Sequence, residues 1–114
     1  MAIDIEAKRP VIGNNQGGLS GPAIKPMALL KVHQVYQVCK AHRIPIIGQG
    51  GVTSVEDAIE FLLAGASAVG VGTALFYHPL ICPQLNAGIR SYLERQRFPD
   101  VQALTGSLEL NTQP

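Results

Sequence analysis

Hydrophobic residues recur at helical spacing in three segments of this 114-residue chain. The first runs from about Pro26 to Ala41, the second ends at Ala64, and the third follows a turn at His78-Pro79. A spacing of three or four residues places apolar side chains on one face, so the pattern predicts three amphipathic helices. Their apolar positions are Leu29, Val32, Tyr36 and Cys39, then Ile59, Leu62, Leu63 and Ala66, then Leu85, Ile89, Tyr92 and Leu93.

Two short apolar runs separate these helices. They are Ile44 to Ile47 and Ser67 to Val71, and a glycine turn follows each one. The first has the form of a parallel strand buried on both faces, and the second is predicted to be another short strand. Strands that alternate with helices predict an α/β fold with a parallel sheet.

The second helix has the clearest end signals. Thr53 and Ser54 offer side-chain oxygens to the free N–H groups of its first turn, and Glu56 and Asp57 suit a capping box and the helix dipole. Gly65 is the expected carboxyl-terminal cap. These residues predict a helix that begins after Ser54 and ends at Ala64.

The ends of the chain are less regular. Met1 to Ile5 alternates as a hairpin arm does, and Pro10 to Gly21 is a glycine-rich loop. One more helical turn is expected near Val101 to Leu104, within a tail that runs from Pro99 to the end of the chain.

Composition narrows the function classes. The formal net charge is +1 without a basic cluster, and tryptophan is absent, so nucleic acid is not an expected partner. No apolar stretch is long enough to span a membrane and the first residues do not resemble a signal peptide, so we expect a cytoplasmic protein. Cys39 and Cys82 lack CxxC spacing and fall inside predicted helices, so we interpret them as buried thiols rather than metal ligands.

The two glycine turns are the strongest functional signal. Gly50-Gly51 follows the first strand, and Gly72-Thr73 follows the second about 22 residues later. Glycines between a strand and a helix expose backbone N–H groups that can hold phosphate, and the positive end of the helix after Gly51 would add to them. Each turn could instead be a plain tight turn. A dinucleotide-binding fingerprint fits less well, because Leu75 occupies the place of its third glycine.

No catalytic base stands out from the sequence. The polar residues near helix starts, Ser20, Lys25 and Asp57, are explained by capping and solvation. The histidines form no HExxH pair and no dyad with a nucleophile. We therefore predict neither a catalytic residue nor a metal site. The histidines are His33, His42 and His78.

Three motifs together resemble one enzyme family. Gly17 to Pro26, Ile46 to Val52 and Ala64 to Ala74 closely resemble, in the same order, the carboxyl-terminal part of dihydroorotate dehydrogenase. The resemblance runs from about Met1 to Gly106. The opening residues and the segment ending at Pro26 look most like the class 1 enzymes, and within them the NAD-linked 1B type.

The resemblance implies an FMN-containing (β/α)8 TIM barrel that oxidises dihydroorotate to orotate in pyrimidine biosynthesis. A complete barrel needs about 250 residues, so residues 1–106 would be its carboxyl-terminal βα units and residues 107–114 a tail. By the family's pattern, Gly21, Gly50, Gly51, Gly72 and Thr73 contact FMN, mostly at its phosphate and ribityl end.

The resemblance also implies what this chain does not supply. The family's catalytic base, its flavin-contacting lysine and the asparagines that hold the pyrimidine belong to segments that precede Met1. We therefore expect the isolated chain to be inactive, and the whole enzyme to be an oligomer working with an iron–sulfur electron-transfer subunit. Two alternatives stay open: a related flavin barrel such as dihydropyrimidine dehydrogenase, and a non-catalytic fragment that binds FMN or phosphate.

Overall fold

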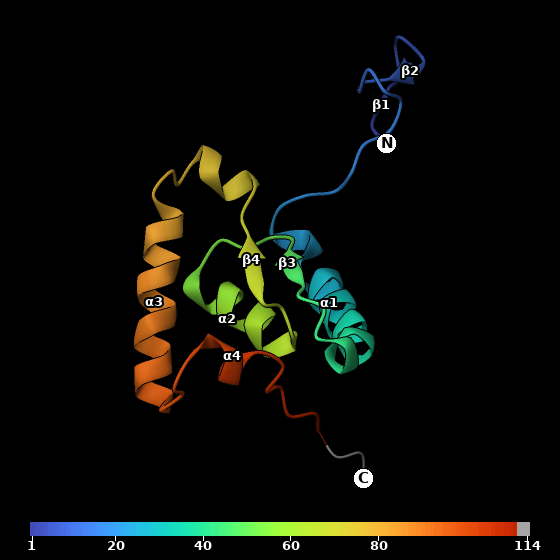
Figure 1. The fold of residues 1–114 in the computed structure, drawn as a ribbon. Coiled ribbons are helices and arrows are strands. Elements are labelled where there is room, and N and C mark those ends of the chain that lie inside the picture. Colours follow the sequence, from blue (N-terminus) through green and yellow to red (C-terminus); the bar gives the residue numbers. More distant parts are fainter. Residues whose placement is uncertain (112–114) are drawn as a thin grey trace.

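Two parallel strands lie at the centre of the fold, β3 (Ile47–Gln49) and β4 (Ala68–Gly70). The computed structural model describes residues 1–111. Ile47 lies opposite Ala68 and Gln49 opposite Gly70, so the carboxyl ends of both strands reach the same edge. Helices lie around this strand pair, with α1 beside β3 and α3 on the far side of α2 (Figure 1).

The helices lie close to their predicted positions. α1 and α3 have the expected inward faces, and the short helix near the end of the chain is also present. On α2 the predicted face omitted Phe61 and Ala58, which are fully buried. The alternation of parallel strands and helices predicted from the sequence is thereby confirmed. The bounds are α1 (Lys25–Cys39), α2 (Val55–Ala64), α3 (Ile81–Gln96) and α4 (Val101–Leu104), with 3-10 turns η1 (Pro22–Ile24), η2 (Lys40–His42) and η3 (Thr73–Phe76).

The core forms around α2. Phe61 on this helix is fully buried, as is Leu104 on α4. A Cβ atom at Gly48 would lie 2.7 Å from the Phe61 ring, so the inward face of β3 must be glycine for α2 to pack this closely. Helix α2 therefore joins the strand pair to α1 and α3. The other core members are Val32, Val52, Ala58, Ala64, Ala66, Ala74, Ile81 and Leu85.

The strands differ from the sequence prediction in position and in burial. β3 begins at Ile47, where the predicted run from Ile44 ends, and its side chains alternate between exposed and buried. Ile47 is 70% exposed, so β3 is buried on only one face within residues 1–111. The physical reason is that, among residues 1–111, the helices cover only the face of the strands that carries Gly48.

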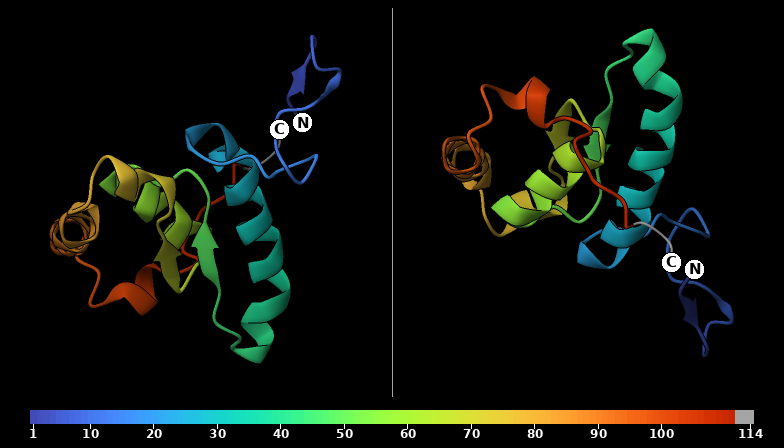
Figure 2. Two further views of the ribbon diagram at one scale, coloured as in Figure 1. Left: turned by 90° about the horizontal axis from the view of Figure 1, so that it is seen from above. Right: turned by 90° about the horizontal axis from the view of Figure 1, so that it is seen from below.

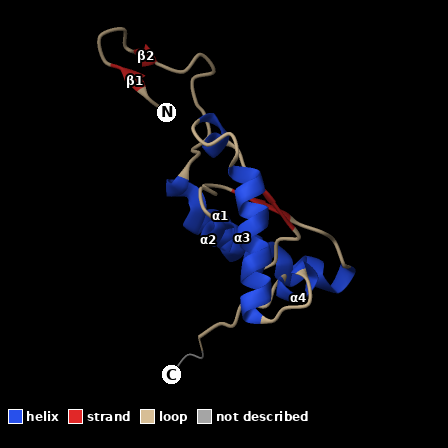
Figure 3. Cartoon of the chain, turned by 90° about the vertical axis from the view of Figure 1, so that its left-hand side faces the viewer, coloured by secondary structure: helices blue, strands red, loops and turns tan. Residues whose placement is uncertain are grey.

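The amino-terminal hairpin extends away from the helices. Its strands β1 (Ile3–Asp4) and β2 (Arg9–Pro10) pair antiparallel, as predicted. Figures 2 and 3 show the hairpin at one end of the molecule, joined to the rest by the glycine-rich loop. Its apolar side chains, Ile3 and Ile5 among them, are exposed.

The two cysteines lie in helices, but the prediction of buried thiols is wrong for Cys82. Cys39 is half-buried at the end of α1, whereas Cys82 is exposed on the first turn of α3. Cys82 lies on the side of α3 that faces an open groove, described below. Neither cysteine is paired in the part of the chain that the structure describes.

Gly106 and the residues that follow it also contact the core. The N–H groups of Gly106 and Leu108 donate to the carbonyl oxygens of Leu62 and Leu63 at 3.0 and 3.3 Å. The first residues of the predicted tail, 107–114, thus pack on α2, while residues 112–114 lie outside the described residues. None of the helices within residues 1–111 is long and apolar enough to cross a bilayer.

Candidate functional site

All five residues predicted from the glycine turns and the family pattern line one pocket. It has a volume of about 340 Å³ and lies at the carboxyl ends of β3 and β4. Three loops meet there: the loop before α1, the turn after β3 and the turn after β4. The lining residues are Leu19, Ser20, Gly21, Ile24, Gln49, Gly50, Gly51, Val52, Gly70, Val71, Gly72 and Thr73.

The first two loops are in direct contact. A Cβ atom at Gly51 would lie 2.6 Å from the carbonyl oxygen of Gly21 and 2.9 Å from the Cα atom of Pro22. The backbone of Gly51 has a φ of +74°, which other residues rarely adopt. Gly50 is equally constrained, because a Cβ atom there would lie 2.8 Å from that of Ala28 on α1. These positions accept only glycine.

Backbone donors in the pocket are free. Within residues 1–111, the N–H groups of Gly51, Gly72 and Thr73 form no hydrogen bond. Gly51 and Thr73 are half-buried, and N–H groups at such positions normally have partners, so free donors there suit an acceptor from a ligand. The hydroxyl groups of Ser20 and Thr73 add two further donors.

The start of α2, which follows the Gly50-Gly51 turn, is capped by its own side chains. The Ser54 side chain accepts from the Asp57 N–H, and Asp57 Oδ2 accepts from the N–H groups of Thr53 and Ser54 at 2.8 and 3.0 Å. This is the predicted capping box, and it takes up the Asp57 N–H of the first turn. The sequence prediction of a capped α2 is therefore confirmed.

Asp57 also forms an ion pair that the sequence analysis missed. Lys25 Nζ lies 2.5 Å from Asp57 Oδ1 and 2.8 Å from Glu60 Oε2. Burial raises the pKa of Asp57, but hydrogen bonds from Lys25 and Thr53 outweigh it and lower that pKa to about 2. The same hydrogen bonds to Asp57 and Glu60 raise the pKa of Lys25. Lys25 is thus held between two carboxylates rather than solvated.

Gln49 is a second residue that sequence reasoning missed. Its side chain covers Gly70, since a Cβ atom at Gly70 would lie 2.9 Å from Gln49 Oε1. The amide group therefore lies on the exposed face of the strand pair, at the edge of the pocket. The alternation along a strand was the available signal, because Gly48 faces the core and its neighbour must face the opposite side.

The pocket has no titratable side chain in its lining. The histidines lie elsewhere, with His33 near Gln37 on α1 and His78 stacked edge-on against Tyr77. Among the described residues, no cluster of His, Cys, Asp or Glu could hold a metal ion. The arrangement can therefore bind an anion through backbone groups, but it offers no base for proton transfer.

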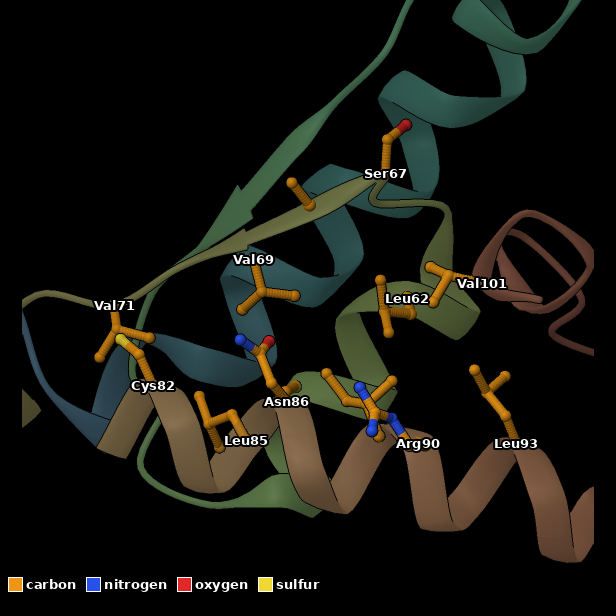
Figure 4. A pocket seen from close by; sticks show the side chains of 13 residues that line it. Leu62, Ser67, Val69, Val71, Cys82, Leu85, Asn86, Arg90, Leu93 and Val101 are labelled. Carbon is orange, nitrogen blue, oxygen red and sulfur yellow. The ribbon is translucent and has the colours of Figure 1, made fainter. Parts of the chain in front are cut away.

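A larger groove of about 550 Å³ lies between β4 and α3. Figure 4 shows that apolar side chains such as Val69, Leu85 and Leu93 line it, with Asn86 and Arg90 projecting from α3. It contains none of the predicted site residues and no glycine turn. The candidate site is therefore not the pocket with the greater volume but the one that has free backbone donors.

Comparison with known proteins agrees with the motifs. The family model described as dihydroorotate dehydrogenase matches residues 1–93, which is most of the chain. The chain belongs to this family. The catalytic subunit of dihydroorotate dehydrogenase B (NAD(+)) from Trichlorobacter lovleyi is 50% identical over 109 residues, 96% of this chain and 35% of that protein. The subunit of the same name from Geotalea daltonii is 51% identical over 110 residues, again 96% and 35%.

A solved dihydroorotate dehydrogenase shares the local fold. The ligand-free enzyme from Eimeria tenella superposes with a TM-score of 0.74 and 30% sequence identity, over 90% of this chain and 28% of that one. The structural relative supports the α/β, TIM-barrel-type fold predicted for this segment. The chain spans about a third of the length of the curated dihydroorotate dehydrogenase relatives that it matches.

Proposed function

We propose that this chain forms the FMN-phosphate-binding end of a dihydroorotate dehydrogenase barrel. One observation carries the proposal: Gly21, Gly50, Gly51, Gly72 and Thr73 come from three separate loops and line a single pocket with free N–H donors. In (β/α)8 barrels, phosphate groups commonly bind above the carboxyl ends of the last strands. The pocket lies at the corresponding edge of β3 and β4.

The residues present fit the phosphate and ribityl end of FMN. The turns at Gly51 and Gly72 would donate backbone hydrogen bonds to the phosphate, and the hydroxyl groups of Ser20 and Thr73 would add to them. The absence of a Cβ atom at Gly51 keeps the pocket open next to Gly21. This chain would then bind and orient the cofactor without contacting the reacting atoms of the substrate.

The activity proposed for the whole protein follows from its family. Bound FMN supplies the electron acceptor for the oxidation of dihydroorotate to orotate in pyrimidine biosynthesis. No titratable side chain lines the pocket, so the base for this reaction would come from another part of the protein. We therefore expect residues 1–106 to act as the carboxyl-terminal units of the barrel and to be inactive alone.

A partner subunit is part of the proposal. The relatives from Trichlorobacter and Geotalea are named catalytic subunits of the NAD(+)-linked type. A catalytic subunit implies a second one, and we propose an iron–sulfur electron-transfer subunit in an oligomeric enzyme. The alternative is a non-catalytic segment that only binds FMN or phosphate, which the lack of a titratable group in the pocket favours.

A chimera separates these two functions. Residues 1–106 would replace the matching third of the Geotalea daltonii catalytic subunit, and dihydroorotate-dependent loss of flavin absorption would be measured. We expect the chimera to hold FMN and to reduce it with dihydroorotate, while the same chimera with Gly51→Val holds no FMN. A chimera that holds FMN but does not react with dihydroorotate would support the non-catalytic alternative.

A further inference from the structure

The Lys25 ion pair adjoins the glycine pocket along two segments of the chain. Lys25 follows Ile24, which lines the pocket, and Asp57 is bonded to Thr53, two residues after Gly51. The side chain of Asp57 is 11% exposed and that of Lys25 is 24% exposed, so the pair is partly buried. The pair joins the beginning of α1 to the beginning of α2.

The Lys25–Asp57 ion pair and the contact of Gly51 with Gly21 link the same two loops. At one end, Gly51 touches Gly21 and Pro22. At the other end, Lys25 Nζ bonds Asp57 Oδ1, while Asp57 Oδ2 accepts from the N–H and hydroxyl groups of Thr53 at 2.8 and 2.9 Å. The loop before α1 and the loop before α2, which are about 30 residues apart in sequence, are thus held to each other at two points.

The positive charge of Lys25 also affects the affinity of the pocket for an anion. An unpaired carboxylate at Asp57 would lower the affinity of the neighbouring pocket for an anion, because like charges repel across a partly buried site. Lys25 neutralises that carboxylate, and Glu60 binds the opposite side of the ammonium group. With its charge taken up by two carboxylates, Lys25 itself is not a ligand for phosphate.

We propose that Lys25 is a positioning residue: it holds and neutralises Asp57, and so keeps the Gly50-Gly51 turn against Gly21 in the form that binds phosphate. The proposal rests on the proposed function. It differs from a purely stabilising role, because it predicts a selective effect on ligands that carry a phosphate.

The test compares FMN with riboflavin, which lacks the phosphate, by following backbone amide signals in NMR titrations of the full chain. Lys25→Met should weaken FMN binding about tenfold, because the unpaired Asp57 carboxylate would repel the phosphate, and should leave riboflavin binding unchanged. Lys25→Arg should restore FMN binding. Lys31→Met removes an exposed charge from the same helix and should have no effect.

The signals of Tyr92 on α3 report whether each variant is folded, and Lys25→Gln replaces Lys25→Met if that variant unfolds. Equal FMN affinity in the Lys25→Met and Lys31→Met variants would overturn the proposal. Equal weakening for FMN and riboflavin would also overturn it. A wild-type chain whose Gly51 signal does not respond to FMN would instead contradict the proposed function, and this proposal with it.

Discussion

The backbone of Gly51 touches that of Gly21, because a Cβ atom at position 51 would lie 2.6 Å from the Gly21 carbonyl oxygen. Gly51→Ala must therefore displace one loop and adopt an unfavourable φ of +74°. We expect a loss of roughly 1–3 kcal/mol in the free energy of unfolding, measured by urea denaturation, together with a loss of FMN binding.

Gly13→Ala is the matched control for this change. Position 13 has open space around it and lies outside the pocket, so the variant should keep both stability and binding. If Gly51→Ala is as stable as Gly13→Ala and binds FMN equally well, the close approach of the two loops does not matter to the site.

Asp57 should make stability depend on pH in the acid range. Its pKa is lowered to about 2 in the folded chain, from 3.8 when unperturbed, so folding favours the charged form. The resulting stabilisation, about 2 kcal/mol, is present above pH 4 and is lost as the pH falls towards 2. Asp57→Asn should remove this part of the pH dependence in urea denaturation, whereas Asp4→Asn on the projecting hairpin should retain it.

Phe61 should be the most costly aromatic residue to truncate. It is fully buried between α2 and the strands, and Phe61→Ala should lower the free energy of unfolding by about 3–5 kcal/mol. Phe76 on η3 is 90% exposed, and Phe76→Ala should change it by less than about 0.5 kcal/mol. Comparable losses for the two variants would contradict the described core.

Ile47 should promote self-association. Its side chain lies on the exposed face of β3, beside strand edges that are free to pair within residues 1–111. We expect concentration-dependent association in sedimentation velocity, and Ile47→Thr should reduce it. Val38→Thr, at a similarly exposed site on α1, should not. A chain that stays monomeric at high concentration would contradict this expectation.

Local signals explain what could be predicted from the sequence. The capping residues Ser54 and Asp57 and the cap Gly65 act within a few residues of their own helix, so the bounds of α2 were predicted correctly. The strand bounds were less accurate, because β3 is defined by its pairing with β4 rather than by the apolar run before Ile47.

Long-range contacts explain what could not be predicted. Lys25 and Asp57 are 32 residues apart, and each alone is consistent with a solvated or capping role. Only the packing of α1 beside α2 brings them together. Glycine turns at the ends of two parallel strands meet at one edge of the sheet, so the meeting of Gly50, Gly51, Gly72 and Thr73 could be predicted from the sequence, whereas Gly21 followed only from the family pattern.

Titration of the wild-type chain with FMN and with riboflavin tests the central claim most directly, with backbone amide signals as the readout. The account predicts that FMN shifts the signals of Gly51, Gly72 and Thr73, and that riboflavin shifts them much less because it lacks the phosphate. Unchanged signals at saturating FMN, or equal shifts with both ligands, would contradict the assignment of this pocket to the phosphate of FMN.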